Sequence, residues 1–255
     1  MNEHHLARLE AHTGAALIQR VGRGIRLTPE GQLFAQRAAE IVGRVDAATA
    51  ELAAHVGLRA GRVRLAAFES ILSTVVPAAA TTLARRHPGI ELSLVDLHPT
   101  EALRTLREGK LDLALIFRYA ETPLEEHGFR LVHLMDDPVY LMSQRPDQTL
   151  AAHRNSRWIA GCTRCQEELI AMCAQEGYAP NIAYVSDDMV VNQSMVAAGM
   201  GVTVLPGLAL RAHRTPDIHA TELPRHPRQI YAVTYGDPPD PPATTALLTA
   251  IQEAL

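Results

Sequence analysis

Apolar residues recur at spacings of three and four along residues 28–60, and this pattern predicts one long helix. The repeating positions are Phe34, Ala38, Ile41, Val45, Ala48, Leu52 and Val56. A stripe this narrow, sustained for about three heptads, is typical of the seam of a two-stranded coiled coil. An amphipathic helix packed against its own domain is the alternative. We favour pairing of two chains because glycines at 57 and 61 bracket a linker directly after the helix.

After this helix, short apolar runs alternate with helical patterns. The first part of the region predicts strands over residues 63–68, 90–97 and 111–117, with helices over 71–87 and 100–108. Strands and helices that alternate in this order predict a parallel sheet with right-handed crossover connections. The expected fold class is therefore α/β.

A second unit of the same kind lies further along the chain. Its predicted strands cover residues 139–143, 158–161, 182–186 and 202–205, and its helices cover 165–177 and 187–199. The chain then returns with a strand over 229–235 and a helix that runs to Leu255. Crossing points near 136–138 and 223–227 indicate that one subdomain is inserted into the other. We expect subdomain I to comprise residues 61–137 and 224–255, and subdomain II to comprise residues 138–223.

The first 27 residues have the pattern of a helix followed by a hairpin. Leu6, Leu9 and Glu10 lie on a helix that ends at Gly14, a residue suited to the left-handed conformation of a helix C-cap. Two short apolar strands flank the basic turn Val21-Gly22-Arg23-Gly24. Thr28-Pro29-Glu30 then opens the long helix with an N-cap hydroxyl, a proline and a carboxylate.

In this order, the helix, hairpin and helix resemble the recognition helix, wing and linker helix of LysR-type transcriptional regulators. The residues that match the family pattern are Leu9, Glu10, Gly14, Leu17, Arg20, Gly22, Arg23, Leu27, Thr28 and Gly31. The family usually places the first two helices of its helix-turn-helix before this point, so we expect the chain to begin inside the recognition helix. The resemblance implies a partial winged helix-turn-helix over 1–27, a linker and dimerisation helix over 28–60, and two Rossmann-like effector subdomains of the periplasmic-binding-protein type.

The resemblance also implies what the chain does. A LysR-type regulator binds DNA and a small-molecule effector, and the effector favours one packing of the effector subdomains, which repositions the paired DNA-binding regions. The linker helix implies a homodimer and leaves open whether dimers pair into homotetramers. The residues expected to contact DNA are Arg8, Arg20, Arg23, Arg26 and Thr28.

An effector is expected at the carboxyl ends of the strands, where helix N-termini offer unpaired N–H groups. Ser70 and Thr100 match positions where the family usually places effector-binding hydroxyls. Each hydroxyl has the alternative of only capping a helix. Arg118 is expected either to neutralise a carboxylate effector or to contact only solvent. The candidate effector-binding residues are Ser70, Ser73, His98, Thr100, Phe117, Arg118, Cys162, Thr163 and Asp187.

The cysteines leave two interpretations open. Cys162-Thr163-Arg164-Cys165 has the C-x-x-C spacing of redox and zinc motifs, and it lies where a helix opens after a strand. A zinc site needs four ligands, and the nearest histidine, His153, has an irregular spacing. Cys173 lies further along the same predicted helix and suggests a face packed inward. We favour buried or cavity-lining thiols, with a redox or metal sensor as the alternative.

Two further functions compete with the regulator. A chain with a truncated recognition helix would be a solute-binding or sensor module without specific DNA binding. A small-molecule enzyme on the same fold is the third candidate, but no G-x-S-x-G, Walker or H-E-x-x-H pattern is present. Gly199-Met200-Gly201 falls between a helix and a strand, which indicates a helix end rather than a dinucleotide loop. We therefore expect no enzyme activity, no cofactor and no metal site.

Composition narrows the possible partners. The net charge of −4 means that DNA affinity must come from a local basic patch. No run of about eighteen apolar residues is present, so a membrane span is not expected, and the N-terminus has no signal-peptide core. Together with three cysteines expected to be reduced, these features predict a cytoplasmic protein with no membrane partner.

Overall fold

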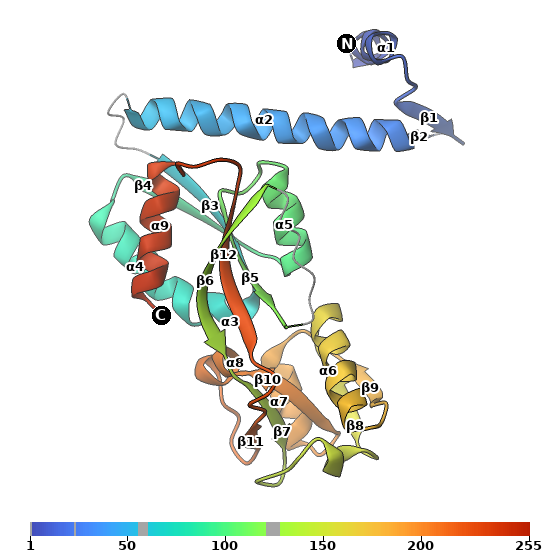
Figure 1. Cartoon of the computed structure of the whole chain (residues 1–255), viewed down its shortest axis with the longest axis vertical. Coiled ribbons are helices and arrows are strands. Elements are labelled where there is room, and N and C mark those ends of the chain that lie inside the picture. The colour runs from blue at the N-terminus through green and yellow to red at the C-terminus, as the bar shows by residue number, and fades with distance from the viewer. Residues whose placement is uncertain (1, 23, 56–60, 121–127) are drawn as a thin grey trace.

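A long helix lies across the first of two lobes (Figure 1). A shorter helix and a hairpin, which precede it in the chain, lie beyond one of its ends. The computed structural model describes all residues except 1, 23, 56–60 and 121–127. The N-terminal part consists of α1 (Asn2–Thr13), β1 (Ile18–Val21), β2 (Gly24–Leu27) and α2 (Pro29–His55). β1 and β2 form an antiparallel hairpin.

Local hydrogen bonds fix the start of α2 and the hairpin beside it. The Thr28 hydroxyl accepts a hydrogen bond from the amide of Gly31 at 2.9 Å and donates one to the carbonyl of Ala16 at 2.6 Å. The Glu10 carboxylate of α1 accepts a hydrogen bond from the amide of Leu17 at 2.7 Å. Thr28 therefore caps the long helix as the sequence predicts, and Glu10 ties α1 to the segment that leads into β1.

The first lobe is built on a five-stranded sheet with the order β4-β3-β5-β12-β6. Strands β3, β4 and β5 are parallel, whereas β12 runs antiparallel to both of its neighbours. The elements of this lobe are β3 (Gly61–Ala67), α3 (Glu69–Leu72), α4 (Val75–Arg86), β4 (Ile90–Asp96), α5 (Pro99–Arg107), β5 (Leu113–Arg118), β6 (Phe129–Asp137), β12 (Arg228–Tyr235) and α9 (Pro242–Glu253).

The second lobe contains another five-stranded sheet, with the order β11-β7-β10-β8-β9. Strands β8, β9 and β10 are parallel, and β7 runs antiparallel to β10 and β11. The elements of this lobe are β7 (Val139–Ser143), a 3-10 helix (Ala151–His153), β8 (Arg157–Ala160), α6 (Thr163–Gln175), β9 (Asn181–Val185), α7 (Met189–Ala197), β10 (Val202–Pro206), α8 (Gly207–Ala212) and β11 (His219–Glu222).

The lobes are joined by two chain crossings that lie side by side. The first crossing leads from β6 through Pro138 to β7, and the second leads from β11 to β12. One buried cluster of apolar side chains includes Leu65 and Leu115 of the first lobe and Trp158 and Met172 of the second. The cores of the two lobes are therefore continuous through the region of the crossings.

The structure confirms the α/β class and corrects details of the expected element order. The helix expected over 71–87 is two helices, α3 and α4. The three strands expected to be parallel, β3, β4 and β5, are parallel. The complete first sheet is mixed, because β12 returns from the second lobe and enters it in the opposite direction. Strands β6 and β11 and helix α8 were not expected. β6 lacks the two-residue alternation of burial that marks a half-buried strand, so its pattern gave no signal.

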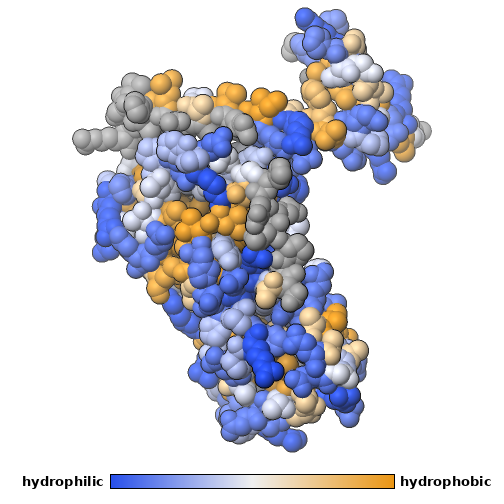
Figure 2. Space-filling model, viewed as in Figure 1, coloured by the Kyte–Doolittle hydropathy of each residue, from blue (hydrophilic) through white to orange (hydrophobic). Residues whose placement is uncertain are grey.

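One face of α2 carries large apolar side chains that no other part of the described chain covers (Figure 2). Of the expected seam, Ile41 is 63% exposed, Val45 59% and Leu52 65%, and Phe34 is also exposed. Val56 lies outside the described residues. The seam is therefore available for packing against another molecule. Among the described residues, no helix combines the length and apolarity needed to cross a membrane.

Candidate functional site

A cavity of ≈ 90 Å³ lies between the two lobes, next to the chain crossings. Most of the surface that lines it is apolar, with a few polar and charged groups among the aromatic and aliphatic side chains. Both lobes contribute to the wall, the first through Phe68, Glu69, Ser70, His98, Phe117, Tyr119 and Arg228, and the second through residues that include Ile159, Ala160, Cys162, Cys165, Leu169, Met172, Asp187 and Asn192. A ligand in this cavity would contact both lobes at once.

Arg228 forms one wall of the cavity together with two aromatic rings. Its guanidinium carbon lies 4.9 Å from the ring centroid of Phe68 and 4.8 Å from that of Phe117. The guanidinium donates hydrogen bonds to Asp137 Oδ2 at 2.8 Å and to Ser70 Oγ at 2.7 Å. The side chains of Arg228 and Asp137 are almost fully buried, 4% and 1% exposed. A buried charge needs such compensation, so the positive charge of Arg228 is already neutralised before any ligand enters.

Glu69 places a carboxyl group in the cavity beside the second lobe. Partial burial, followed by the negative charges of Asp188 and Asp96, raises the pKa of Glu69 above its ordinary value. A hydrogen bond from the backbone amide of Met189 opposes this rise. Because Met189 is the first residue of α7, this hydrogen bond links the two lobes.

Further polar contacts between the lobes surround the mouth of the cavity. His98 Nε2 lies 3.2 Å from Asp187 Oδ2. Arg164 of α6 donates a hydrogen bond to the carbonyl of Phe117 at 3.1 Å and another to the Thr100 hydroxyl at 3.4 Å. His98, Phe117 and Thr100 belong to the first lobe, so these contacts hold the lobes together in the described arrangement.

Two thiols lie at the start of α6. Cys162 is the N-cap residue, and its sulfur accepts a hydrogen bond from the amide of Cys165 at 3.4 Å. The two Sγ atoms are 2.9 Å apart. The hydrogen bond between the sulfurs, in which Cys165 keeps its proton, lowers the pKa of Cys162 to about 6 against the opposing effect of burial. The same contact, together with burial, raises the pKa of Cys165 well above its ordinary value.

Asn192 carries an unsatisfied polar atom at the cavity. Its side chain is only 2% exposed, and its amide nitrogen donates a hydrogen bond to the carbonyl of Ser186 at 3.0 Å. Its Oδ1 atom has no hydrogen-bond partner among the described residues. An unsatisfied acceptor costs about 1–3 kcal/mol when it is buried. Oδ1 has almost no accessible surface, so a ligand in the cavity would reach it only if neighbouring side chains moved.

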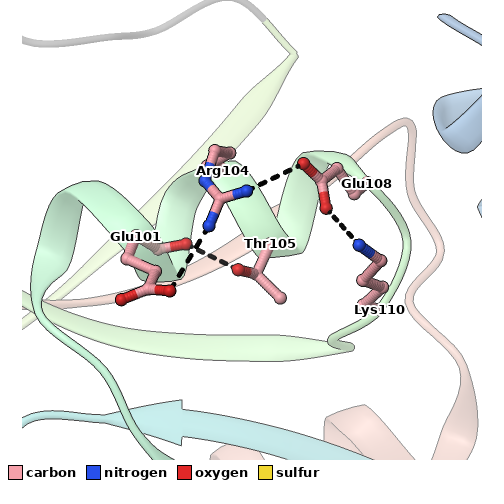
Figure 3. A network of polar contacts seen from close by, with 5 residues as sticks. All are labelled: Glu101, Arg104, Thr105, Glu108 and Lys110. Atoms are coloured by element: carbon pink, nitrogen blue, oxygen red, sulfur yellow. Dashed lines mark hydrogen bonds and ion pairs between the residues drawn. The ribbon is translucent and has the colours of Figure 1, made fainter. Parts of the chain in front are cut away.

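A larger groove of ≈ 1190 Å³ lies outside the cavity, between α2 and the first lobe, and Cys162, His98 and Asp187 border both spaces. A polar network on α5 forms part of the groove wall (Figure 3). Arg104 donates hydrogen bonds to Glu101 and Glu108, both at 3.3 Å, and Lys110 donates one to Glu108 at 2.6 Å. Apart from Glu108, the charged side chains of the network are exposed, so its ion pairs contribute little to stability.

The structure divides the nine candidate effector residues into three groups. Ser70, His98, Phe117, Cys162 and Asp187 border the cavity between the lobes. Thr100 and Thr163 lie on the outer groove. Ser73 and Arg118 lie in neither place: Ser73 is exposed and its hydroxyl donates a hydrogen bond to the carbonyl of Glu69, and the guanidinium of Arg118 lies 5.7 Å from the ring centroid of Tyr231.

The candidate DNA-contacting residues lie at the N-terminal end. Arg8 is exposed on α1, and Arg20 and Arg26 are exposed on the two strands of the hairpin. Thr28 is committed to capping α2. Arg23 lies outside the described residues. The arginines of the hairpin therefore point to solvent from a two-stranded ribbon.

Sequence reasoning missed several residues that shape the cavity. Arg228 and Asp137 face each other across the chain crossings, Tyr119 lies against Cys165, and Asn192 projects from α7. The only signal for Arg228 was a charged residue at the start of a strand that is otherwise mostly apolar. No sequence pattern marked the other three residues, Asp137, Tyr119 and Asn192. Each is placed at the cavity by contacts with a distant part of the chain.

A zinc ion at the cysteines would need further ligands. No group of three or more His, Cys, Asp and Glu side chains that would hold a metal ion occurs within the described part of the chain. The two cysteines at the start of α6 carry free thiols that contact each other.

Comparison with known proteins assigns a family to this arrangement. The family model described as the LysR substrate binding domain matches residues 57–255. A relative from Synechococcus elongatus, the probable HTH-type transcriptional regulator LrrA, is 29% identical over 229 residues, which cover 86% of this chain and 75% of the relative.

Two solved structures have a similar fold. Full-length CbnR complexed with its target DNA has a TM-score of 0.64 and 19% identity, and the match covers 99% of this chain and 88% of CbnR. The effector-binding domain of BenM with its effector benzoate has a TM-score of 0.62 and 12% identity, and the match covers 75% of this chain and 90% of that domain.

Proposed function

Because this chain belongs to the LysR family of transcriptional regulators, we propose that a small effector binds in the cavity between its lobes and changes how the chain engages DNA. We further propose that the chain acts by binding rather than by catalysis, and that it works in the cytoplasm, where a regulator reaches DNA. The organisation into residues 1–27, 28–60, 61–137 with 224–255, and 138–223 is part of the same proposal.

The cavity wall that both lobes share carries this proposal. A ligand that contacts both lobes stabilises one angle between them, and this differential affinity is what an effector needs in order to shift a conformational equilibrium. The contacts between His98 and Asp187 and between Arg164 and Thr100 are exposed and polar. Such contacts are weak, so a ligand of modest affinity is enough to rearrange them.

The chemistry of the wall favours a particular kind of effector. Phe68, Phe117 and Met172 offer apolar surface, and the carboxyl groups of Glu69 and Asp187 offer hydrogen-bond acceptors. The acidic groups Glu69, Glu168 and Asp187 border the cavity, whereas the charge of Arg228 is compensated by Asp137. We therefore propose a neutral or cationic effector with an apolar body and a hydrogen-bond donor. The similar BenM domain binds benzoate as its effector, and a carboxylate of that kind would meet unfavourable charge here.

The signal would reach DNA through α2 and the hairpin. α2 packs on the first lobe at Gly43, which contacts Gly109 after α5. Its exposed seam of Ile41, Val45 and Leu52 would pair with a second copy of the chain. The exposed arginines of the hairpin would then contact phosphates or the minor groove. CbnR, which has a similar fold, forms a complex with its target DNA, and this complex supports DNA as the partner proposed for the present chain.

A thermal-shift screen of small amines, alcohols and carboxylates of matched size would test the proposed effector site. We expect amines or alcohols to raise the melting temperature and carboxylates of the same shape to have no effect. Ala160 lines the cavity and is 1% exposed, so Ala160→Val would narrow it and abolish the shift. Ala183→Val on the exposed face of β9 is the matched control and should respond as the wild type does. A ligand shift that Ala160→Val leaves unchanged would place the effector elsewhere.

A further inference from the structure

Cys162 and Cys165 form a dithiol whose geometry is close to that of a disulfide. Their Sγ atoms are 2.9 Å apart, and a disulfide bond is about 2.05 Å long. The sulfurs thus need to approach by less than about 1 Å, which side-chain rotation in the first turn of a helix supplies.

The two sulfurs differ in their environment, which gives them different roles. Cys162 caps a helix of 13 residues and receives hydrogen bonds from the thiol and the amide of Cys165. The lowered pKa of Cys162 favours its thiolate, which is the form that attacks a disulfide. Cys165 lies deeper, against Tyr119, and keeps its proton. Among the ionisable groups that act on Cys162, His98 favours the thiolate and Asp187 opposes it.

The third cysteine is too far away to compete for the bond. Cys173 is on the same helix as Cys165, eight residues later, and a helix rises about 1.5 Å per residue. The two sulfurs are therefore separated by about 12 Å along the helix axis. Cys173 is also fully buried at 0% exposure. Cys173 therefore serves as an internal control, because a thiol that is buried and distant from the pair should not react.

Cys162 is accessible from outside the cavity. It borders the open groove between α2 and the first lobe, which has a volume of ≈ 1190 Å³ and includes Thr163 and Arg164 in its wall. A molecule as large as a tripeptide disulfide can enter a groove of this size. We propose that Cys162 and Cys165 form a reversible redox site that exchanges with a low-molecular-weight disulfide, in which Cys162 is the attacking thiol and Cys165 the resolving thiol.

The reaction proceeds in two exchange steps. The Cys162 thiolate attacks one sulfur of the small disulfide RSSR, the S–S bond breaks, and RS⁻ leaves while a mixed disulfide forms at Cys162. Cys165 then gives its proton to solvent and attacks the Cys162 sulfur, and the second RS⁻ leaves. The two protein sulfurs lose two electrons in total, and RSSR is reduced to two thiols. An excess of the small thiol reverses both steps.

The site is physically connected to the contacts between the lobes. Arg164 lies between the two cysteines in sequence and donates hydrogen bonds to Phe117 and Thr100 of the first lobe. Disulfide formation changes the first turn of α6, in which Arg164 lies. The redox site is independent of the proposed effector. The product of the exchange reaction is a covalent Cys162–Cys165 bond, which can be mapped directly.

The test incubates the full chain with glutathione disulfide and reduced glutathione at a series of ratios, then traps free thiols and maps linkages by mass spectrometry. We expect a Cys162–Cys165 disulfide that appears in a single two-electron transition. The Cys165→Ser variant should accumulate a glutathione adduct at Cys162. The Cys162→Ser variant should leave Cys165 unmodified, with an adduct yield at least about tenfold lower, because the remaining thiol does not border the groove and its raised pKa keeps it protonated. Cys173→Ala should behave as the wild type does.

Circular dichroism of each variant at the start of the reaction checks that the fold is retained, and the wild type in denaturant shows the reactivity of the unfolded cysteines. Equal adduct yields at Cys162 and Cys165 in the native variants would overturn the assignment of roles. A linkage that involves Cys173, the absence of any Cys162–Cys165 bond, or a bond that only a hydroperoxide produces would each overturn the exchange site.

Discussion

Asp137 and Arg228 form a buried ion pair at the point where the two chain crossings meet. Asp137 is the last residue of β6 and Arg228 is the first of β12, and the two are paired in register. Their side chains are joined by a hydrogen bond of 2.8 Å. The second carboxylate oxygen of Asp137 accepts a hydrogen bond from the amide of Leu208 at 3.0 Å, so the carboxylate also holds the start of α8.

Replacement of this carboxylate should destabilise the protein strongly. In Asp137→Asn the buried guanidinium of Arg228 loses its compensating charge, and removal of one partner of a buried pair costs about 3–5 kcal/mol. The matched control is Asp136→Asn, because Asp136 is the preceding residue and its side-chain contact with His133 is exposed. The control should cost less than about 1 kcal/mol. Urea unfolding measures the free energy of unfolding of both variants. Equal decreases in the two variants would show that the buried ion pair does not contribute more to stability than the exposed contact does.

Glu69 should make the stability of the fold depend on pH. Its pKa is raised in the folded state by burial and by nearby carboxylates, so the folded chain binds this proton more tightly than the unfolded chain does. Stability linked to Glu69 is therefore present at low pH and is lost as the pH rises through the ordinary and then the raised pKa. Glu69→Gln removes this loss.

Melting temperatures at about pH 4 and about pH 7 would test the role of Glu69. At the higher pH, the melting temperature of Glu69→Gln should exceed that of the wild type. At the lower pH, the difference in melting temperature between the two proteins should be smaller. Glu91→Gln, on the exposed surface of β4, is the control and should show no such difference. If the gain in melting temperature of Glu69→Gln were larger at low pH than at high pH, the predicted effect of Glu69 would be wrong.

Gly43 is required for α2 to pack on the first lobe. A Cβ atom at this position would lie 2.4 Å from the Cα atom of Gly109, and neither backbone can give way cheaply. Helix propensity alone predicts that Gly43→Ala stabilises the protein by about 1 kcal/mol, whereas the clash predicts a loss of about 1–3 kcal/mol. We expect a lower melting temperature and faster hydrogen exchange in α2.

The control for Gly43→Ala is Thr49→Ala, which also adds helix propensity and lies at an exposed position of α2. It should leave the melting temperature unchanged or raise it slightly. A rise in melting temperature for both variants would mean that α2 does not pack closely on the loop after α5.

The seam of α2 should determine the oligomeric state. Ile41 and Val45 are exposed in one chain, and burial of such a side chain contributes about 1.5–3 kcal/mol. The double variant Ile41→Glu with Val45→Glu should therefore weaken dimerisation by more than about tenfold. Sedimentation velocity over a range of concentrations measures this, with Gln36→Glu on another face of α2 as the control. A double variant that associates as tightly as the wild type would exclude α2 as the dimer contact.

The hairpin arginines should contribute to DNA affinity through charge. In the variant Arg20→Ala with Arg26→Ala, each lost phosphate contact reduces the slope of log affinity against log salt by about 1. Fluorescence anisotropy with a random-sequence duplex at several salt concentrations measures the slope. Arg85→Ala removes an exposed arginine from α4 and should leave the slope unchanged. Equal slopes for all three proteins would exclude the hairpin as the contact.

Local sequence patterns predicted the elements that are stabilised locally. Thr28, Pro29 and Glu30 marked the start of α2, and in the structure Thr28 bonds the amide of Gly31, only three residues away. The start of α6 was placed two residues late, because the cap is the sulfur of Cys162 rather than a hydroxyl or carboxylate. Strand β6 was missed because its partner β12 is distant in sequence and its burial does not alternate.

In the candidate site, too, local sequence predicted some features, whereas contacts between distant residues determined others. Residues at or just after the carboxyl ends of β3, β4, β5, β8 and β9 were expected near a ligand. Of these, Ser70, His98, Phe117, Cys162 and Asp187 border the cavity. The same rule also selected Ser73 and Arg118, which lie away from it, because the rule gives the edge of the sheet but not the direction of a side chain. Which atoms meet there depends on the angle between the lobes.

By itself, the sequence determined the alternation of strands and helices, the long helix with its apolar seam, and the spacing of the two thiols, since each of these depends on residues within a few positions of one another. Only the tertiary structure decided that β12 runs antiparallel beside β6, that Arg228 meets Asp137, and that Cys162 faces both the cavity and the groove. Contacts between residues far apart in sequence are selected by the packing of whole elements, and no local pattern specifies them.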